Sequence, residues 1–225
     1  MVRARARRPT ALGLDFFEVS ARRLACRLLG THLVHDAPCG TRRAARIVEV
    51  EAYEGPTDPA CHARFGITTR TRTLFGPPGH AYVYFIYGMH ECFNVTALRE
   101  GAGHAVLIRG VEPLWDAAAR TDGPGRLTRA LGIDRSHDGV SLLTGSLRIE
   151  PGDRKLGTVG QSPRVGVGYA GCAADLPWRF FELGNPHVSR PSRSQLGQRN
   201  AADATTTTSV ATPAAKTTRV PRRTQ

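Results

Sequence analysis

The segment from Arg46 to Tyr53 alternates apolar and polar side chains. A period of two residues fits a β-strand, whose side chains point to opposite faces in turn, and does not fit a helix. One face of the predicted strand is apolar and is made by Val48, Val50 and Ala52. The opposite face carries two carboxylates and a phenol, from Glu49, Glu51 and Tyr53. The chain must therefore contain a sheet with at least one buried face.

The polar face of this strand has two explanations. It can be a solvated sheet face, or clustered carboxylates at a strand end can hold a general base or a metal ion. Asp58 and His62 follow closely, but no second histidine or carboxylate stands at a recognised metal-ligand spacing. The sequence therefore argues against a metal site and leaves the solvated face and the general base open.

Further segments complete the fold prediction. A helix is predicted from Asp15, as its N-cap, to Leu29, with Gly30 as its stop. Strands are predicted at Ala81–Tyr87, Cys92–Ala97, Ala105–Val111 and Arg164–Val167, and a short helix near Gly123–Gly125. The polar turn 99–103 joins two of these strands into a hairpin. Neighbouring strands with few helices between them indicate an α+β domain rather than a doubly wound sheet.

The charge of the chain is uneven. The sequence has 225 residues, and 31 Lys and Arg against 19 Asp and Glu give a net charge of +12, much of it near the two ends. We predict a basic flexible N-terminus over residues 1–13 and one folded domain over residues 14–190. Residues 191–225 hold too few large apolar side chains to offset the entropy of ordering them, so we predict a disordered, basic, threonine-rich tail. Basic tails attract polyanions loosely and say nothing about catalysis.

The lengths of the apolar runs and the pattern of cysteines indicate the cellular compartment of the protein. The longest apolar run, Ala81–Met89, has nine residues, against the ~20 that a membrane-spanning helix needs. The 5 cysteines form no CxxC pair, which argues against a disulfide framework and a structural zinc site. A reducing environment is the simpler explanation. We therefore expect a cytoplasmic protein with no membrane partner.

The 32 positions from Pro59 to His90 contain no acidic residue. They interleave cations and histidines with aromatic rings, namely Arg64, Arg70, Arg72, His62, His80 and His90 with Phe65, Phe75, Tyr82, Tyr84, Phe85 and Tyr87. Cations bind phosphates and flat rings stack on bases, so the composition is typical of a nucleic-acid interface. The alternative is that the rings form core and the arginines lie on loops, although each buried tyrosine hydroxyl then needs a partner.

Several ordered motifs resemble the alkyladenine (3-methyladenine) DNA glycosylase family. The resemblance covers about residues 12–190. Its motifs are, in chain order, Arg46–Pro56 with Asp58 and His62, Tyr82–Met89 with Asn94, Val106–Pro113, Gly123–Leu127, Pro163–Val167 and Trp178–Phe180. Together these motifs form a strong signal, although none of them would do so alone.

The resemblance implies a fold and an activity. The fold would be a single α+β domain with a curved, mostly antiparallel sheet, flanking helices and a protruding β-hairpin. The activity would be that of a monofunctional DNA glycosylase, which hydrolyses the N-glycosidic bond of alkylated or deaminated purines such as 3-methyladenine, hypoxanthine and ethenoadenine. The partner would be duplex DNA containing damaged purines. The enzyme would need no metal or organic cofactor, act as a monomer, begin base excision repair and associate with the nucleoid if it is bacterial.

The resemblance also implies roles for single residues. Glu51 matches the catalytic carboxylate, a general base for a water that attacks the anomeric carbon, and Arg109 and the Val165 carbonyl match groups that help hold this water. Three rings match the walls of the base pocket: Tyr53, His62 and Tyr84. Tyr87 matches the side chain that wedges into the duplex where the damaged nucleotide has left. Asn94 matches a pocket residue that crowds the exocyclic amine of normal guanine.

Structural alternatives remain for these residues and for the activity. Asn94 can be a turn residue and Tyr84 a core ring. A non-catalytic nucleic-acid-binding domain on the same scaffold would bind without releasing a base. A lyase-type glycosylase would need a lysine amine in a desolvated pocket, and the only lysines are Lys155 and Lys216, neither of which is suitably placed.

Overall fold

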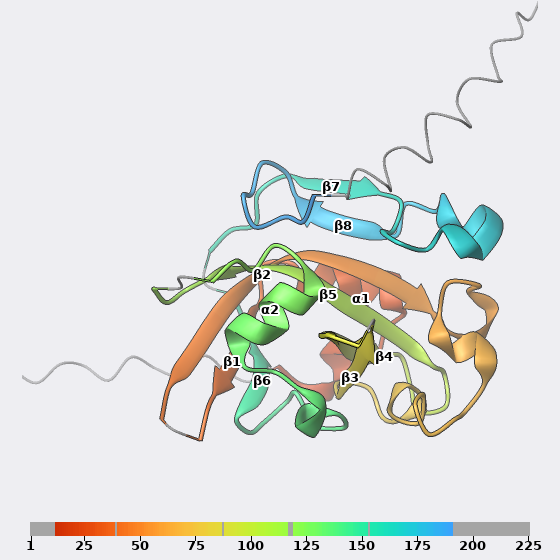
Figure 1. The fold of residues 1–225 in the computed structure, drawn as a ribbon, viewed down its shortest axis with the longest axis horizontal. Coiled ribbons are helices and arrows are strands. Elements are labelled where there is room, and N and C mark those ends of the chain that lie inside the picture. Colours follow the sequence, from red (N-terminus) through yellow and green to blue (C-terminus); the bar gives the residue numbers. More distant parts are fainter. Residues whose placement is uncertain (1–11, 39, 87, 117–118, 153, 191–225) are drawn as a thin grey trace, which may run out of the picture. The chain divides into compact units, whose positions relative to one another are not determined.

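The computed structural model of the chain describes residues 12–38, 40–86, 88–116, 119–152 and 154–190 (Figure 1). The predictions made for most of segment 1–13, for Tyr87 and for the tail 191–225 concern residues outside these ranges.

Two short α-helices and eight strands form the described part of the chain (Figure 1). The helices are α1 (Ala21–Leu28) and α2 (Pro124–Leu131). The strands are β1 (His32–Asp36), β2 (Arg42–Glu54), β3 (Ala81–Ile86), β4 (His90–Ala97), β5 (His104–Pro113), β6 (Leu147–Glu150), β7 (Val159–Ser162) and β8 (Arg179–Glu182). Single turns of 3₁₀ helix link them at Leu14–Phe16, Gly55–Thr57, His62–Phe65, Thr73–Phe75 and Arg135–His137, and a longer 3₁₀ segment spans Gly168–Ala174. Within the described ranges, no helix has the length and apolar character to cross a bilayer.

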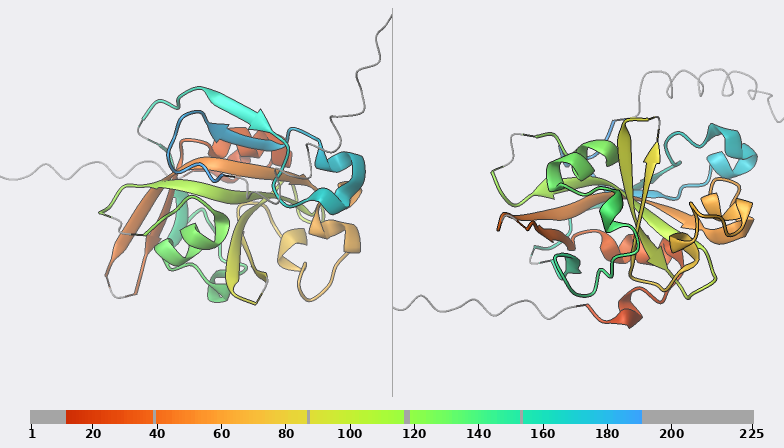
Figure 2. Two further views of the ribbon diagram at one scale, coloured as in Figure 1. Left: turned by 45° about the horizontal axis from the view of Figure 1, so that its top comes forward. Right: turned by 60° about the horizontal axis from the view of Figure 1, so that its bottom comes forward.

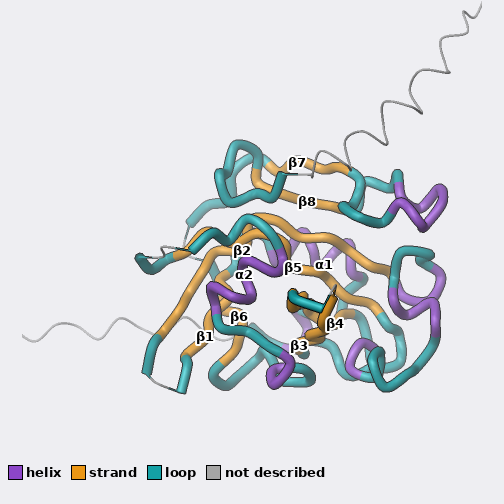
Figure 3. Tube along the Cα trace, in the orientation of Figure 1, coloured by secondary structure: helices purple, strands orange, loops and turns teal. Residues whose placement is uncertain are grey.

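The strands form one antiparallel sheet built around β2. Its order is β3-β4-β5-β2-β1-β6, with β8 paired to both β2 and β7 (Figures 1 and 3). The N-terminal half of β2 pairs with β1 and its C-terminal half with β8, so the sheet divides beside this strand. The sheet curls, and the β3–β4 hairpin projects from it (Figure 2). The predicted α+β domain with a curved antiparallel sheet is confirmed.

A β-bulge interrupts the alternation that the sequence predicts along β2. The pairing of β2 with β5 shifts register between Ile47 and Glu49 and again before Val50. As a result Ile47 and Val50, three residues apart, both belong to the main core cluster, whereas Val48 is buried outside it. The prediction that Val48 shares a face with Val50 and Ala52 is therefore wrong for Val48.

Both faces of β2 are covered around the two carboxylates. Glu49 and Glu51 are fully buried, with 0% of their surface exposed. The hypothesis of a solvated sheet face is therefore wrong, because Val165, Arg179 and Ser189 bind these carboxylates and exclude solvent from them.

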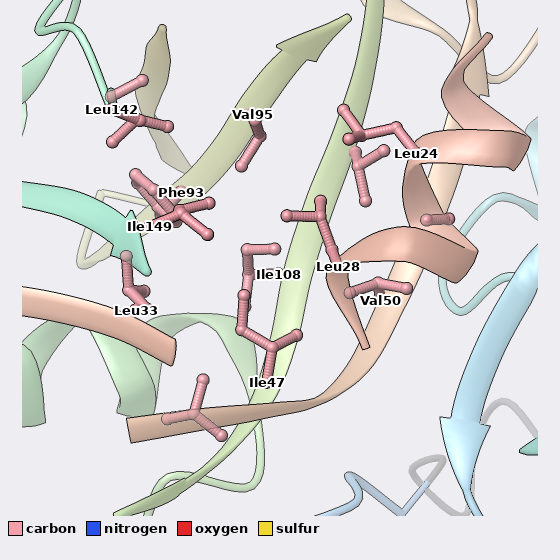
Figure 4. Packing of buried hydrophobic residues seen from close by; sticks show 14 of the residues in the cluster. Leu24, Leu28, Leu33, Ile47, Val50, Phe93, Val95, Ile108, Leu142 and Ile149 are labelled. Atoms are coloured by element: carbon pink, nitrogen blue, oxygen red, sulfur yellow. The ribbon is translucent and has the colours of Figure 1, made fainter. Parts of the chain in front are cut away.

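Helix α1 packs against the sheet, and the main core lies between them (Figure 4). Leu24 and Leu28 lie one turn apart on α1 and point toward Val50 and Ile108 of the sheet (Figure 4). Both leucines are fully buried. This layer holds β2 and β5 together, and these two strands carry the carboxylates and Arg109.

Helix α1 begins later than predicted. Residues Leu14–Phe16 form a 3₁₀ turn, and the helix starts only after Ser20, so Asp15 is not its N-cap. The side chain of Arg27 donates hydrogen bonds to the carbonyls of Asp15 and Phe16, which satisfies groups that a longer helix would have paired internally. The end of the helix agrees with the prediction, since Gly30 follows it with φ +85°.

The predictions for the β4–β5 hairpin and for α2 are confirmed, and one for a late strand is wrong. Residues Arg164–Val167 are irregular, and the strand of this region is β7 instead. Gly166 has φ +76°, a left-handed conformation that interrupts an extended segment. The two residues before this turn bind buried carboxylates: Arg164 binds Asp58, and the N–H of Val165 binds Glu51.

Replacing Leu28 by alanine is expected to lower the free energy of unfolding by about 2–5 kcal/mol, because it leaves a cavity between α1 and the sheet. Arg23→Ala is the control, since Arg23 is exposed on the same helix and its loss is expected to change stability by no more than about 0.5 kcal/mol. Urea unfolding followed by circular dichroism measures both. Equal losses in the two variants would contradict this packing.

Candidate active site

A pocket opens at the end of the sheet where β2, β3 and β4 meet the 3₁₀ segments. About 360 Å³ of space lies between its walls, part of it open to solvent, which suits a small planar ligand. The residues that line it are Tyr53, Ala60, Cys61, His62, Leu74, Tyr82, Tyr84, Asn94, Ala105 and Tyr169. None of these side chains is a carboxylate, a lysine or an arginine.

Aromatic rings form most of the wall. Tyr82 and Tyr84 point the same way because they are two residues apart on β3, and their ring centroids are 5.2 Å apart. His62 meets Tyr84 edge-on, with centroids 4.6 Å apart. Phe75 and Tyr82 are buried in a small core cluster, against which the half-buried Tyr84 packs, and both tyrosines line the pocket. The core explanation therefore holds for Phe75 but is incomplete for Tyr82 and Tyr84.

His62 stays uncharged in this pocket. Burial and the positive charges of Arg70 and Arg64 lower the pKa of His62 to about 4. Its Nδ1 lies 3.1 Å from the Tyr82 hydroxyl, and burial raises the pKa of Tyr82 to about 12, so the tyrosine keeps its proton. Neutral hydrogen-bonding groups therefore occupy this wall at physiological pH.

Asn94 lies in the middle of β4, opposite Tyr82, and not in a turn. Its side-chain amide donates a 3.0 Å hydrogen bond to the Tyr82 carbonyl, and only 3% of the residue is exposed. The turn alternative for Asn94 is therefore wrong, and its fixed amide faces the pocket.

Glu51 lies directly behind the pocket wall. One carboxylate oxygen, Oε1, accepts a 2.6 Å hydrogen bond from the backbone N–H of Val165, and Oε2 accepts a 2.9 Å bond from the hydroxyl of Tyr53. Burial and the charge of Glu51 raise the pKa of Tyr53, which keeps its hydroxyl protonated as a donor. The Nε atom of Arg109 lies 3.4 Å from Oε1. Tyr53 thus links the carboxylate to the space that a ligand would fill.

Glu49, on the same face of β2, accepts more hydrogen bonds from the protein than Glu51 does. It accepts hydrogen bonds from Nε of Arg109 (3.1 Å), Nε of Arg179 (2.7 Å), and both the backbone N–H (2.5 Å) and the hydroxyl (2.7 Å) of Ser189. Three of these four hydrogen bonds end on Oε1 and one on Oε2, so both oxygens of Glu49 are held by the protein. Among the described residues Glu51 accepts only two hydrogen bonds, which leaves it able to bind a water.

Arg109 is held between the two carboxylates. Burial alone would lower its pKa, but the negative charges of Glu51 and Glu49 raise it above the usual value, so the guanidinium stays charged. Gly110, which pairs with Glu49 across the sheet, lets the C-terminal segment pass close by, because a Cβ there would collide with the His187 carbonyl. This approach brings Ser189 onto Glu49.

A buried ion pair fixes the segment that carries Val165. Arg164 binds both carboxylate oxygens of Asp58, at 2.6 and 3.0 Å, and the two side chains are almost completely buried. Asp58 also accepts hydrogen bonds from two backbone N–H groups, those of Glu54 and Ala60. The pair joins the loop after β2 to the segment before Gly168, and these two regions lie side by side (Figures 1 and 2). Asp58 is thus a structural partner in this loop.

Four of the eight predicted site residues line this pocket: Tyr53, His62, Tyr84 and Asn94. Glu51, Arg109 and Val165 form a connected cluster that the Tyr53 hydroxyl joins to the pocket. For Val165 the observed contact is made by the N–H group, whereas the prediction concerns its carbonyl. Tyr87 lies outside the described residues. The described chain contains no group of three or more His, Cys, Asp and Glu residues that could hold a metal ion.

Sequence reasoning missed other residues of the site. It assigned no part to Tyr169, Arg164, Arg179 or Ser189, all of which line the pocket or bind the buried carboxylates. Arg164, Arg179 and Ser189 are more than 100 residues from the carboxylates that they bind. No local pattern could have indicated these pairs. The surplus of arginine over lysine was the only available hint, because a bidentate guanidinium suits buried ion pairs.

Comparison with known proteins adds independent information. The sequence profile of the family described as methylpurine-DNA glycosylase (MPG) matches residues 15–186. A protein of Anaeromyxobacter dehalogenans (strain 2CP-1 / ATCC BAA-258), named as a 3-methyladenine DNA glycosylase, is 51% identical over 177 residues, covering 78% of this chain and 84% of the relative. Relatives with the same name from Myxococcus xanthus (strain DK1622) and Legionella pneumophila (strain Lens) are 49% and 45% identical and cover 78% of this chain, and 92% and 96% of their own length.

The lowered pKa of His62 can be measured directly. Its imidazole is expected to titrate near pH 4, below its ordinary value of 6.5, because burial and two arginines oppose the charged form. Since the unfolded chain takes up the proton first, His62 lowers the stability of the fold as pH falls from about 6.5 toward 4. Proton NMR of the ring resonances measures the midpoint, and His62→Gln identifies the signal. A midpoint near 6.5 would show that His62 is not held in this environment.

Proposed function

The chain belongs to the methylpurine-DNA glycosylase family, a family of N-glycosyl hydrolases that act in DNA repair, and on that premise we propose a substrate and a mechanism for it. The substrates are alkylated or deaminated purines in duplex DNA, of the 3-methyladenine, hypoxanthine and ethenoadenine type. The enzyme hydrolyses the bond between the purine and its sugar, leaves an abasic site and acts as a monomer. This reaction begins base excision repair.

One observation carries the proposal: a buried carboxylate with unused acceptor capacity lies behind a ring-lined pocket. Glu51 meets this description better than Glu49, because Glu49 accepts four hydrogen bonds from the protein and Glu51 accepts two, one of them from the pocket residue Tyr53. A general base must have a free acceptor position within reach of the water that it deprotonates. Glu51 is therefore the residue that performs the chemistry.

Glu51 acts as the general base in this mechanism. It takes a proton from a water as the water attacks the anomeric carbon, and the C–N bond to the purine breaks. The sugar acquires oxocarbenium character in the transition state, which a nearby carboxylate stabilises. Arg109, 3.4 Å from Glu51, orients the same water, and the carbonyl of Val165 assists. The N–H of Val165 keeps the carboxylate in place.

The pocket holds the purine after it has left the helix. Rotating a nucleotide out of the duplex costs a few kcal/mol. Tyr87, which follows β3 in the sequence, fills the gap in the stack and offsets part of this cost. The purine stacks between Tyr53 on one side and His62 and Tyr84 on the other, and the second nitrogen of the neutral His62 ring binds its edge. Asn94 crowds the exocyclic amine of normal guanine, which disfavours undamaged bases.

Glu51→Gln is expected to reduce the single-turnover rate of hypoxanthine excision by at least about 100-fold, since general-base catalysis contributes roughly 10²–10⁴ in rate. The substrate is a duplex with one hypoxanthine, and alkali cleaves the abasic product. Glu54→Gln is the matched control, because Glu54 lies on the same strand and pairs with the half-exposed Arg22 instead of facing the pocket.

Each result of this assay has a distinct meaning. Full activity in Glu51→Gln would contradict the mechanism. Affinity for the duplex without release of a free base from the wild-type protein would indicate a binding domain instead. Trapping of a covalent complex by borohydride would indicate a lyase-type enzyme.

A further inference from the structure

Three tyrosine rings that line the pocket each have a guanidinium group over them. The pairs are Arg164 with Tyr53 at 4.8 Å, Arg64 with Tyr169 at 4.8 Å and Arg70 with Tyr84 at 5.2 Å, measured from the guanidinium carbon to the ring centroid. These distances lie within the range of cation–π attraction. The protein therefore already supplies the cations that the electron-rich faces of these rings attract.

Arg70 differs from the other two arginines in its surroundings. The charge of Arg164 is neutralised by Asp58 in a buried pair. The guanidinium of Arg64 donates a hydrogen bond to the Pro59 carbonyl and lies between two rings. Arg70 is exposed, and within the described ranges no carboxylate lies at ion-pair distance from it. Its positive charge is therefore uncompensated at the edge of the pocket.

The charge of Arg70 acts on three side chains of the pocket wall. It stacks on Tyr84, interacts with the hydroxyl of Tyr82 and is the largest electrostatic cause, after burial, of the lowered pKa of His62. A charge that disfavours a proton on His62 also disfavours any other positive charge in the same space. The residues that line the pocket include no carboxylate, but Glu51 lies behind Tyr53 and its negative charge acts on Tyr53 and Tyr84. Arg70 therefore reduces the attraction that Glu51 exerts on a cation in this space.

We propose that Arg70 is a specificity-determining residue that disfavours positively charged purines in the pocket relative to neutral ones. The inference rests on the proposed function. Purines alkylated on a ring nitrogen, 3-methyladenine and 7-methylguanine among them, carry a positive charge while they are bonded to the sugar, whereas hypoxanthine and ethenoadenine are neutral. Like-charge repulsion from Arg70 weakens binding of the charged bases, and a guanidinium over one face of Tyr84 lowers the attraction of that ring for a second cation.

This selectivity has a chemical use. A positively charged purine leaves its sugar readily, because bond cleavage neutralises it. A neutral purine leaves as an anion and departs far more slowly. By weakening the binding of charged purines, Arg70 therefore directs binding energy to the bases whose cleavage needs it most.

The test compares excision of a charged and a neutral purine under single-turnover conditions. One duplex carries hypoxanthine, and the other is treated with dimethyl sulfate so that released 7-methylguanine can be measured. Arg70→Gln is expected to raise the ratio of 7-methylguanine to hypoxanthine excision by roughly three- to tenfold, the size expected for one partly screened unit charge. Arg70→Lys, which keeps the charge, is expected to retain the wild-type ratio.

Arg72→Gln is the matched control, because Arg72 is an exposed arginine two residues along the same segment. This variant removes one positive charge that can attract DNA, as Arg70→Gln does. A general loss of affinity for DNA lowers both excision rates alike and therefore cancels in their ratio. A second readout does not need catalysis: the pKa of His62, followed by NMR, is expected to rise in Arg70→Gln and to stay unchanged in Arg72→Gln.

An unchanged excision ratio in Arg70→Gln, or an equal change in Arg72→Gln, would overturn the inference while leaving the proposed function intact. A wild-type protein that releases neither base would overturn the proposed function and this inference with it. A raised ratio in Arg70→Lys as well as in Arg70→Gln would assign the effect to shape instead of charge and would also overturn the inference.

Discussion

The buried carboxylate of Glu49 organises the site. Taking a charge out of water is costly, so Glu49 needs donors from every side, and it obtains them from Arg109, Arg179 and Ser189. These contacts tie β5, β8 and the C-terminal segment of the described chain to β2. They also hold Arg109 beside Glu51. The hydrogen bond from Arg109 to Glu49 therefore positions this cation for Glu51.

The β-bulge in β2 shows which features of a strand a local sequence pattern can predict and which it cannot. Alternation correctly predicts a strand and places Glu49, Glu51 and Tyr53 on one face. It cannot predict the extra residue that separates Val48 from the main core, because a bulge depends on the pairing with β5. The solvated-face hypothesis fails for a similar reason, since Val165, Arg179 and Ser189, which bind the two carboxylates, lie more than 100 residues away.

Most of the candidate site was predictable only through the ordered motifs of the family resemblance. Those motifs name the residues that the structure gathers at one pocket, whereas composition alone indicates no more than a nucleic-acid interface. The supporting contacts could not be predicted from the sequence. The Arg164–Asp58 pair and the guanidinium groups over Tyr53 and Tyr84 join segments that only the fold brings together. They determine the orientation and the charge of the pocket, and so bear on which base it accepts.

The most direct test of the account is a crystal structure of Glu51→Gln bound to a duplex containing hypoxanthine. The account predicts the purine outside the helix, stacked between Tyr53 and the rings of His62 and Tyr84, with the anomeric carbon one water molecule away from residue 51. A purine bound elsewhere, or a residue 51 separated from the sugar by the wall of the pocket, would contradict it.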